Sequence, residues 1–140
     1  MFNFGEHLKK LRKNNGITQK QLAAGIGASE RGIQQYELGE RKPTYDMLFS
    51  LANYFKVPVD YLIGHGLYGK EDIIEQHFSE IIKISKDWFA DYFNDSFWDM
   101  LSAADIITKI QILSDLYKDI SIDTDGTLVL YPNIPKKEES

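Results

Sequence analysis

The sequence predicts an all-α N-terminal domain of five short helices, followed by a mainly α C-terminal region that ends in a short β-hairpin. Apolar residues recur at three- and four-residue spacing over most of the 140 residues, which is the pattern of amphipathic helices. The segment TLVLY, near residues 127–131, is instead β-branched and aromatic, and it follows a turn signal at Asp125-Gly126. The 18 aromatic residues are enough for a hydrophobic core in a chain of this length.

The charge of the chain divides it into two parts. Residues 1–64 hold nine Lys and Arg against six Asp and Glu, while residues 65–140 hold seven against fifteen. The seam is the glycine-punctuated segment LIGHGLYGKED, which places a boundary in residues 64–70. We therefore expect a first domain in residues 1–66 and a second part, with a different partner, in residues 67–140.

Each helix of the N-terminal part is indicated by an apolar face and by residues suited to its ends. The first is FGEHLKKLRK, which stops at the NNG that follows it. The second is TQKQLAAGI, which starts with Thr18 and has a glutamine three residues on, as in a capping box. The third is SERGIQQYELG, with Ser29 at its start and Gly39 past its end. The fourth is TYDMLFSLANYF, starting with Thr44, and the last is PVDYLIG, with Pro58 near its first turn.

The second and third helices are joined by roughly three residues around Gly27, which is the spacing of a helix-turn-helix. The turn needs a residue with positive φ, which glycine adopts without Cβ strain. Ala23 must be small, because the second helix of the motif crosses over it closely. The residues expected to point inward and fix the crossing angle are apolar: Leu22, Ile26, Ile33 and Tyr36.

Together these features resemble a phage-repressor-type domain, that is, the lambda-repressor-like or Xre-type helix-turn-helix family. The resemblance covers residues 4–64 and rests on ITQKQLA, the turn at Gly27, YELGERKP in place of the family's Glu-x-Gly-x-x-x-Pro pattern, and VPVDYLIG. It implies a sequence-specific, DNA-binding transcriptional regulator, usually a repressor that binds a palindromic operator as a homodimer.

In such a fold the second helix of the motif, expected over residues 29–37, enters the major groove of double-stranded DNA. Arginine can bond bidentately to guanine, glutamine can bond to adenine, and glutamate can accept a hydrogen bond from cytosine. A carboxylate near phosphates costs affinity, so Glu30 has the alternative roles of orienting Arg31 or excluding wrong sequences. The alternative for the whole set is an ordinary solvated helix face. The candidates for base reading are Glu30, Arg31, Gln34 and Gln35.

Candidate phosphate contacts flank this helix: Thr18, Gln19, Lys20, Arg41 and Lys42. The resemblance implies that Gln19 holds a backbone phosphate, to which its amide and the local helix N-terminus can both donate. Thr18 is at the same time the expected helix cap. The cations can neutralise phosphates. Arg12 and Glu37 resemble the family's buried ion pair between the first helix and the recognition helix, which is a structural role.

The C-terminal region predicts two amphipathic helices. They are EDIIEQHFSEIIKISKDWFADYF, in which a break is open, and SFWDMLSAADIITKIQILSDLYKDI, with Ser96 as its cap. The TLVLY segment then forms a hairpin or one added strand, and the tail IPKKEES is expected to fray.

These two helices carry more large apolar side chains than about 50 residues can bury alone. We therefore favour homodimerisation through residues 71–120, with a self-contained helical subdomain as the alternative. The acidity of this region suits a role away from DNA.

Other chemistry finds little support in the sequence. There is no cysteine for disulfides or metal, and the three histidines are isolated without metal-ligand spacing. The absence of a P-loop, a nucleophile elbow and a dinucleotide fingerprint predicts a protein that is not an enzyme and has no cofactor. The DTDG segment lacks the spacing of a calcium loop. No apolar run could span a bilayer and the N-terminus does not resemble a secretory signal, so we expect a cytoplasmic protein without membrane contact.

Two other functions stay open beside the DNA-binding regulator. One is a protein-interaction module, antitoxin-like or anti-repressor-like, whose acidic C-terminal helices bind a protein partner. The other keeps DNA binding and adds a peptide or small-molecule signal received by the C-terminal region.

Overall fold

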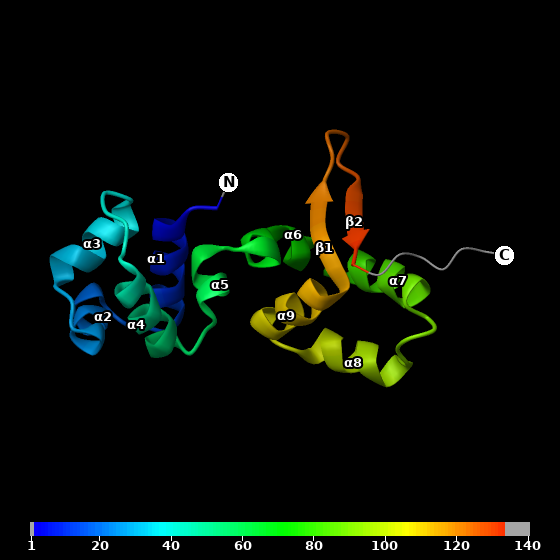
Figure 1. Ribbon diagram of the computed structural model, residues 1–140, viewed down its shortest axis with the longest axis horizontal. Helices are drawn as coiled ribbons and strands as arrows, with labels where there is room; N and C mark the ends of the chain where they lie inside the picture. The colour runs from blue at the N-terminus through cyan, green and yellow to red at the C-terminus, as the bar shows by residue number, and fades with distance from the viewer. Residues whose placement is uncertain (1, 134–140) are drawn as a thin grey trace. The chain divides into compact units, whose positions relative to one another are not determined.

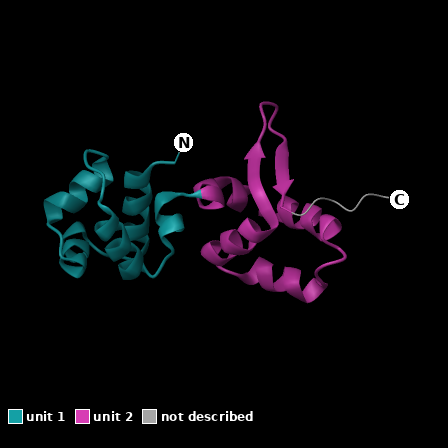
Figure 2. Cartoon of the chain, viewed as in Figure 1, with its two compact units in different colours: residues 1–65 teal, residues 66–140 magenta. Residues whose placement is uncertain are grey.

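The computed structural model describes residues 2–133. Met1 and residues 134–140 lie outside the described residues, and with them the tail expected to fray. The chain forms two compact units, residues 1–65 and residues 66–140 (Figure 2). No helix in the described part is long and apolar enough to span a bilayer.

The described residues of unit 1 form five helices in the order the sequence predicts (Figure 1). The expected caps are present, since the side-chain oxygens of Thr18, Ser29 and Thr44 accept the backbone N–H three residues on at 3.0, 3.0 and 3.2 Å. Gly27 and Gly39 follow two of these helices with φ of 71° and 74°. The helices are α1 (Phe4–Asn14), α2 (Gln19–Ile26), α3 (Glu30–Leu38), α4 (Tyr45–Phe55) and α5 (Val59–Ile63).

One core holds the five helices together. Ala23 is 3% exposed where α3 crosses α2, as its small size predicts, whereas Ile26 is only half-buried. The Arg12–Glu37 pair expected from the sequence already brings α1 against α3, but the close approach at Gly5 was not expected. A Cβ added at Gly5 would lie 2.4 Å from the carbonyl oxygen of Glu37, so only glycine fits there. The buried core residues are Leu8, Leu22, Ala23, Ile33, Tyr36, Leu51, Ala52 and Leu62.

Unit 2 is a layer of short helices with one antiparallel hairpin (Figure 1). In the hairpin, Ile120 pairs with Leu130 and Ser121 with Val129, and the register is irregular between Tyr117 and Asp119. The hairpin alternative is thus confirmed. The elements are the 3₁₀ helix η1 (Gly66–Lys70), α6 (Glu71–Gln76), α7 (Phe78–Trp88), α8 (Asp95–Ala103), α9 (Ile106–Leu116), β1 (Tyr117–Ile122) and β2 (Leu128–Pro132).

Four α-helices occupy the part of unit 2 where two were expected. The first expected helix breaks at His77, the break that the sequence left open. The expectation of one continuous second helix is wrong, because this helix breaks where the side chain of Asp105 caps α9 at 2.7 Å. The cap of α8 is the side chain of Asn94, at 3.1 Å. Ser96 therefore lies inside α8 and is not its cap. The segment expected to end the second helix forms β1 instead, since pairing with β2 outweighs helical periodicity there.

The expectation that these helices cannot bury their apolar side chains alone is also wrong. Phe89 is fully buried, and Trp98 and Tyr117 are each 2% exposed. The two expected helices are not the whole of this core, because η1 and β1 add the buried side chains of Leu67 and Ile120 to it. Unit 2 therefore has the character of the alternative, a self-contained helical subdomain.

Candidate nucleic-acid interface

The turn between α2 and α3 is fixed by backbone and cap contacts. Gly27 takes the left-handed conformation, and the N–H of Ala28 donates to the carbonyl of Ala23 at 2.9 Å. The first turn of α3 is then held by Ser29, whose Oγ accepts the N–H of Gly32. The side chains that follow Ser29 are therefore presented from a helix whose start is well defined.

The four candidate base-reading side chains lie on one side of α3. Glu30, Arg31 and Gln34 are exposed and Gln35 is half-buried. The opposite side of α3 packs against the rest of unit 1, and its buried residues are Gly32, Ile33, Tyr36 and Glu37. Within the described part of the chain, none of the four candidates engages its side chain in a hydrogen bond or ion pair. Three different base-reading chemistries are thus available along one exposed face.

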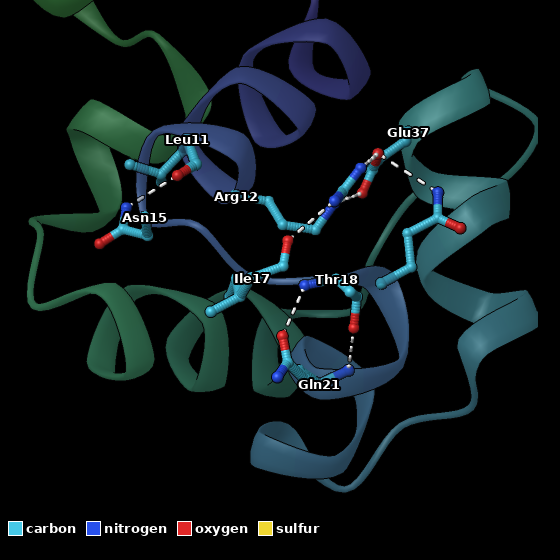
Figure 3. Close-up of polar contacts among 8 residues, drawn as sticks. Leu11, Arg12, Asn15, Ile17, Thr18, Gln21 and Glu37 are labelled. Carbon is cyan, nitrogen blue, oxygen red and sulfur yellow. Dashed lines mark hydrogen bonds and ion pairs between the residues drawn. The ribbon is translucent and has the colours of Figure 1, made fainter.

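An ion pair between Arg12 and Glu37, a buried residue of α3, ties α1 to α3 (Figure 3). The guanidinium of Arg12 donates to both carboxylate oxygens of Glu37, from Nε at 2.8 Å and from Nη2 at 2.9 Å. A third donor, Nη1, bonds the carbonyl of Ile17 at 2.9 Å. The two side chains are 10% and 2% exposed, and the bond to Glu37 raises the pKa of Arg12 above its usual value. This pair is present as the resemblance implied.

Gln19 belongs to the same network, a contact that was not expected from the sequence. Its Nε2 donates to Oε1 of Glu37 at 3.3 Å, so α2, α3 and α1 meet at one carboxylate. One N–H of the Gln19 amide remains for another acceptor, since an amide nitrogen carries two. The signal available in the sequence was a glutamine at the first position of α2 together with a glutamate whose only assigned partner was Arg12.

The other phosphate candidates differ in how far they are engaged. Thr18 forms a complete capping box with Gln21, through contacts of 3.0 and 2.8 Å (Figure 3). Lys20 and Lys42 are exposed. Arg41 is exposed as well, with its guanidinium carbon 5.9 Å from the ring centroid of Tyr36. Arg41 and Lys42 both lie in the loop that follows α3.

No group of three or more His, Asp or Glu within residues 2–133 could hold a metal ion. His7 serves packing instead, with ring centroids 5.1 Å from Phe2 and 4.7 Å from Tyr61. Its Nε2 is buried without a hydrogen-bond partner among these residues. Burial, and then the charge of Lys10, lowers the pKa of His7.

Comparison with known proteins shows that this chain is similar to transcriptional regulators. A Helix-turn-helix family model matches residues 8–62. The HTH-type transcriptional regulator ImmR of Bacillus subtilis (strain 168) is 33% identical over 86 residues, which cover 59% of this chain and 68% of that protein. The uncharacterized HTH-type transcriptional regulator YqaE of the same organism is 40% identical over 60 residues, 43% of this chain and 52% of YqaE.

Two further matches concern repressors. The cryptic phage CTXphi transcriptional repressor RstR of Vibrio cholerae serotype O1 is 37% identical over 59 residues, covering 42% of this chain and 53% of RstR. The crystal structure of the P22 c2 repressor in complex with synthetic operator 9T has 30% identity and a TM-score of 0.44, covering 45% of this chain and 96% of that one. The chain thus spans about half the length of YqaE and RstR.

Proposed function

The chain belongs to the helix-turn-helix family of DNA-binding transcriptional regulators, and we propose that it is a repressor that reads a specific operator through α3. The observation that carries this proposal is the division of α3 into two sides. One side is locked into the core and the ion pair with Arg12, and the other offers unengaged polar side chains. Such a helix can enter the major groove without any cost in packing.

The four candidate side chains of α3 would each contact different bases. Arg31 would bond bidentately to guanine, and Gln34 and Gln35 would contact adenine. Glu30 would accept a hydrogen bond from cytosine, or it would reject sequences that bring a phosphate or another hydrogen-bond acceptor too close to its carboxylate. Each good bidentate contact is worth about 1–3 kcal/mol against the wrong base.

The residues around α3 set the register on the duplex. Gln19 and Thr18 stand at the N-terminus of α2, where amide, hydroxyl and backbone donors can reach one phosphate. Lys20, Arg41 and Lys42 would neutralise further phosphates, which makes binding fall steeply with salt. These phosphate contacts would bind every DNA sequence with similar strength, so the specificity would come from α3.

We propose further that the protein acts as a homodimer on a palindromic operator and represses by occluding a promoter. Two α3 helices would then enter successive major grooves about 34 Å apart. In this proposal residues 1–66 bind DNA, residues 67–140 supply dimerisation and the reception of a protein or peptide signal, and the cytoplasm is the location because DNA is the ligand. The acidity of the C-terminal part supports its separation from the duplex.

Selection of binding sites from random duplex DNA, with the full chain and at two salt concentrations, tests this function. An enriched inverted repeat with half-sites about 10 bp apart is the expected result. A single enriched half-site would retain DNA reading and remove the dimer. Absence of enrichment at both salt concentrations would contradict the proposal and favour the alternative, in which the acidic helices bind a protein partner.

A further inference from the structure

The outer strand of the hairpin, β2, is the least supported apolar element of unit 2. β1 packs against η1, α6 and α9, whereas β1 is the one extensive neighbour of β2 among the described residues. Leu128, Val129 and Leu130 are only half-buried, and Tyr131 is 49% exposed. A two-stranded hairpin is marginal in water, and an apolar strand at its edge invites another strand.

The backbone at this edge has unused hydrogen-bonding groups. The N–H of Asp123 donates to the carbonyl of Thr127 at 3.0 Å, so that carbonyl points toward β1. Backbone groups alternate in direction along a strand, so those of Val129 also face β1 and those of Leu128 and Leu130 face outward. No third strand pairs with the sheet anywhere in residues 2–133.

The charge pattern indicates what can approach this edge. Unit 2 holds seven Lys and Arg against fifteen Asp and Glu, and two such units repel each other over most of their surface. Residues 126–135 are the longest stretch of unit 2 without a charged side chain. β2 also lacks the lysines with which natural edge strands discourage pairing. A second copy can therefore approach along β2 without bringing acidic side chains together.

We propose that β2 pairs antiparallel with β2 of a second copy, about a two-fold axis at Val129, to form a four-stranded sheet. In this register Leu128 lies opposite Leu130 of the partner subunit, and each of these leucines gives and accepts one backbone hydrogen bond. The contact is self-complementary, as a two-fold dimer requires. The inference rests on the proposed homodimer and places its interface outside residues 71–120, whose apolar faces are largely used in the core of unit 2.

Paired charge variants at the two-fold axis test this interface. Val129→Lys and Val129→Glu each place like charges directly opposite one another, which is destabilising in a sheet. We expect the wild type to sediment as a dimer at micromolar concentration, each variant alone as a monomer, and an equal mixture of the two as a dimer again. Met100→Lys, which changes an apolar side chain 48% exposed on α8, is the matched control and should leave the dimer intact.

Three results would overturn the interface. Val129→Lys and Val129→Glu could both remain dimeric, the mixture could fail to regain the dimer although both variants keep the wild-type circular dichroism, or Met100→Lys alone could dissociate it. Amide hydrogen exchange of the wild type needs no variant. The Leu128 and Leu130 amides should be protected in the dimer and lose protection on dilution, and fast exchange within the dimer would contradict the pairing.

The failure of this inference can be told apart from the failure of the proposed function. If the wild type selects an operator but the Val129 variants remain dimeric, the dimer interface lies elsewhere and the regulatory function stands. A wild type that selects an operator and is a monomer at every concentration removes both the homodimer and the β2 contact. Pairing through β2 without any selected operator would leave the interface standing and remove the DNA-reading function.

Discussion

Removing Arg12 while leaving Glu37 in place should destabilise unit 1 strongly. Arg12→Met keeps much of the length of the side chain and takes away three donors, two to Glu37 and one to the carbonyl of Ile17. Breaking a buried pair from one side costs about 3–5 kcal/mol, because a charge stays buried without its partner. We expect the lower end of this range, about 3 kcal/mol, because the Arg12 side chain is 10% exposed and not fully buried.

The measurement must report on unit 1 separately, because a chain of two units need not unfold in one step. Both tryptophans, Trp88 and Trp98, lie in unit 2, so their fluorescence follows that unit. Hydrogen exchange of the α1 and α3 amides reads the opening free energy of unit 1 directly. The expected result is a loss of about 3 kcal/mol in those amides, with the amides of unit 2 unchanged.

Two further variants make this prediction specific. Lys9→Met removes one positive charge from an exposed position of α1 and should change the opening free energy by no more than about 0.5 kcal/mol. The double variant Arg12→Met with Glu37→Leu should recover much of the loss, since an apolar pair has no unpaired charge. If Arg12→Met cost no more than Lys9→Met, the ion pair would not be the buried link between α1 and α3 that the structure shows.

Three other perturbations have clear expected outcomes. Gly5→Ala places a Cβ 2.4 Å from a backbone carbonyl oxygen of α3 and should destabilise unit 1 by about 1–3 kcal/mol, measured by the same exchange experiment; an unchanged stability would refute the close approach. The pKa of His7 lies below the usual 6.5, so the unfolded chain binds its proton first and unit 1 should lose stability as the pH falls below about 6.5. His7→Phe should flatten this pH dependence and His65→Gln, at an exposed position, should not; equal effects of the two would contradict the assignment. Gln19→Ala should weaken binding to every duplex by a similar factor in a gel-shift titration, and a change in sequence preference would argue against a phosphate contact.

The helix-turn-helix could be predicted from the sequence because its determinants are local. Thr18, Ser29 and Thr44 cap helices through bonds to residues three positions away, and Gly27 needs only its own backbone angle to end α2. Such contacts hold whatever the rest of the chain does. The order of the five helices and the inward direction of Leu22 follow from them, and the sequence carries both.

What could not be predicted depends on contacts between distant segments. Gly5 looks like an unremarkable helix residue until α3 is seen to pass against it. The segment around Tyr117 has helical periodicity, but its backbone belongs to a sheet. The hydroxyl group of Tyr117 also shares a buried hydrogen bond with the hydroxyl group of Ser85. The bond from Gln19 to Glu37 likewise joins positions 18 residues apart. In each case packing between distant segments determines the local structure or contact, and no residue nearby in the sequence indicates that packing.

The base-reading roles of the α3 side chains remain a prediction, and Arg31 offers the most direct measurement of them. The wild type and Arg31→Ala are each titrated against the selected half-site and its single-base variants at one fixed salt concentration. The proposal predicts that Arg31→Ala loses about 1–3 kcal/mol of discrimination at one guanine position and keeps its preferences at the others. If Arg31→Ala kept the full preference at every position, the exposed face of α3 would not be the surface that reads DNA.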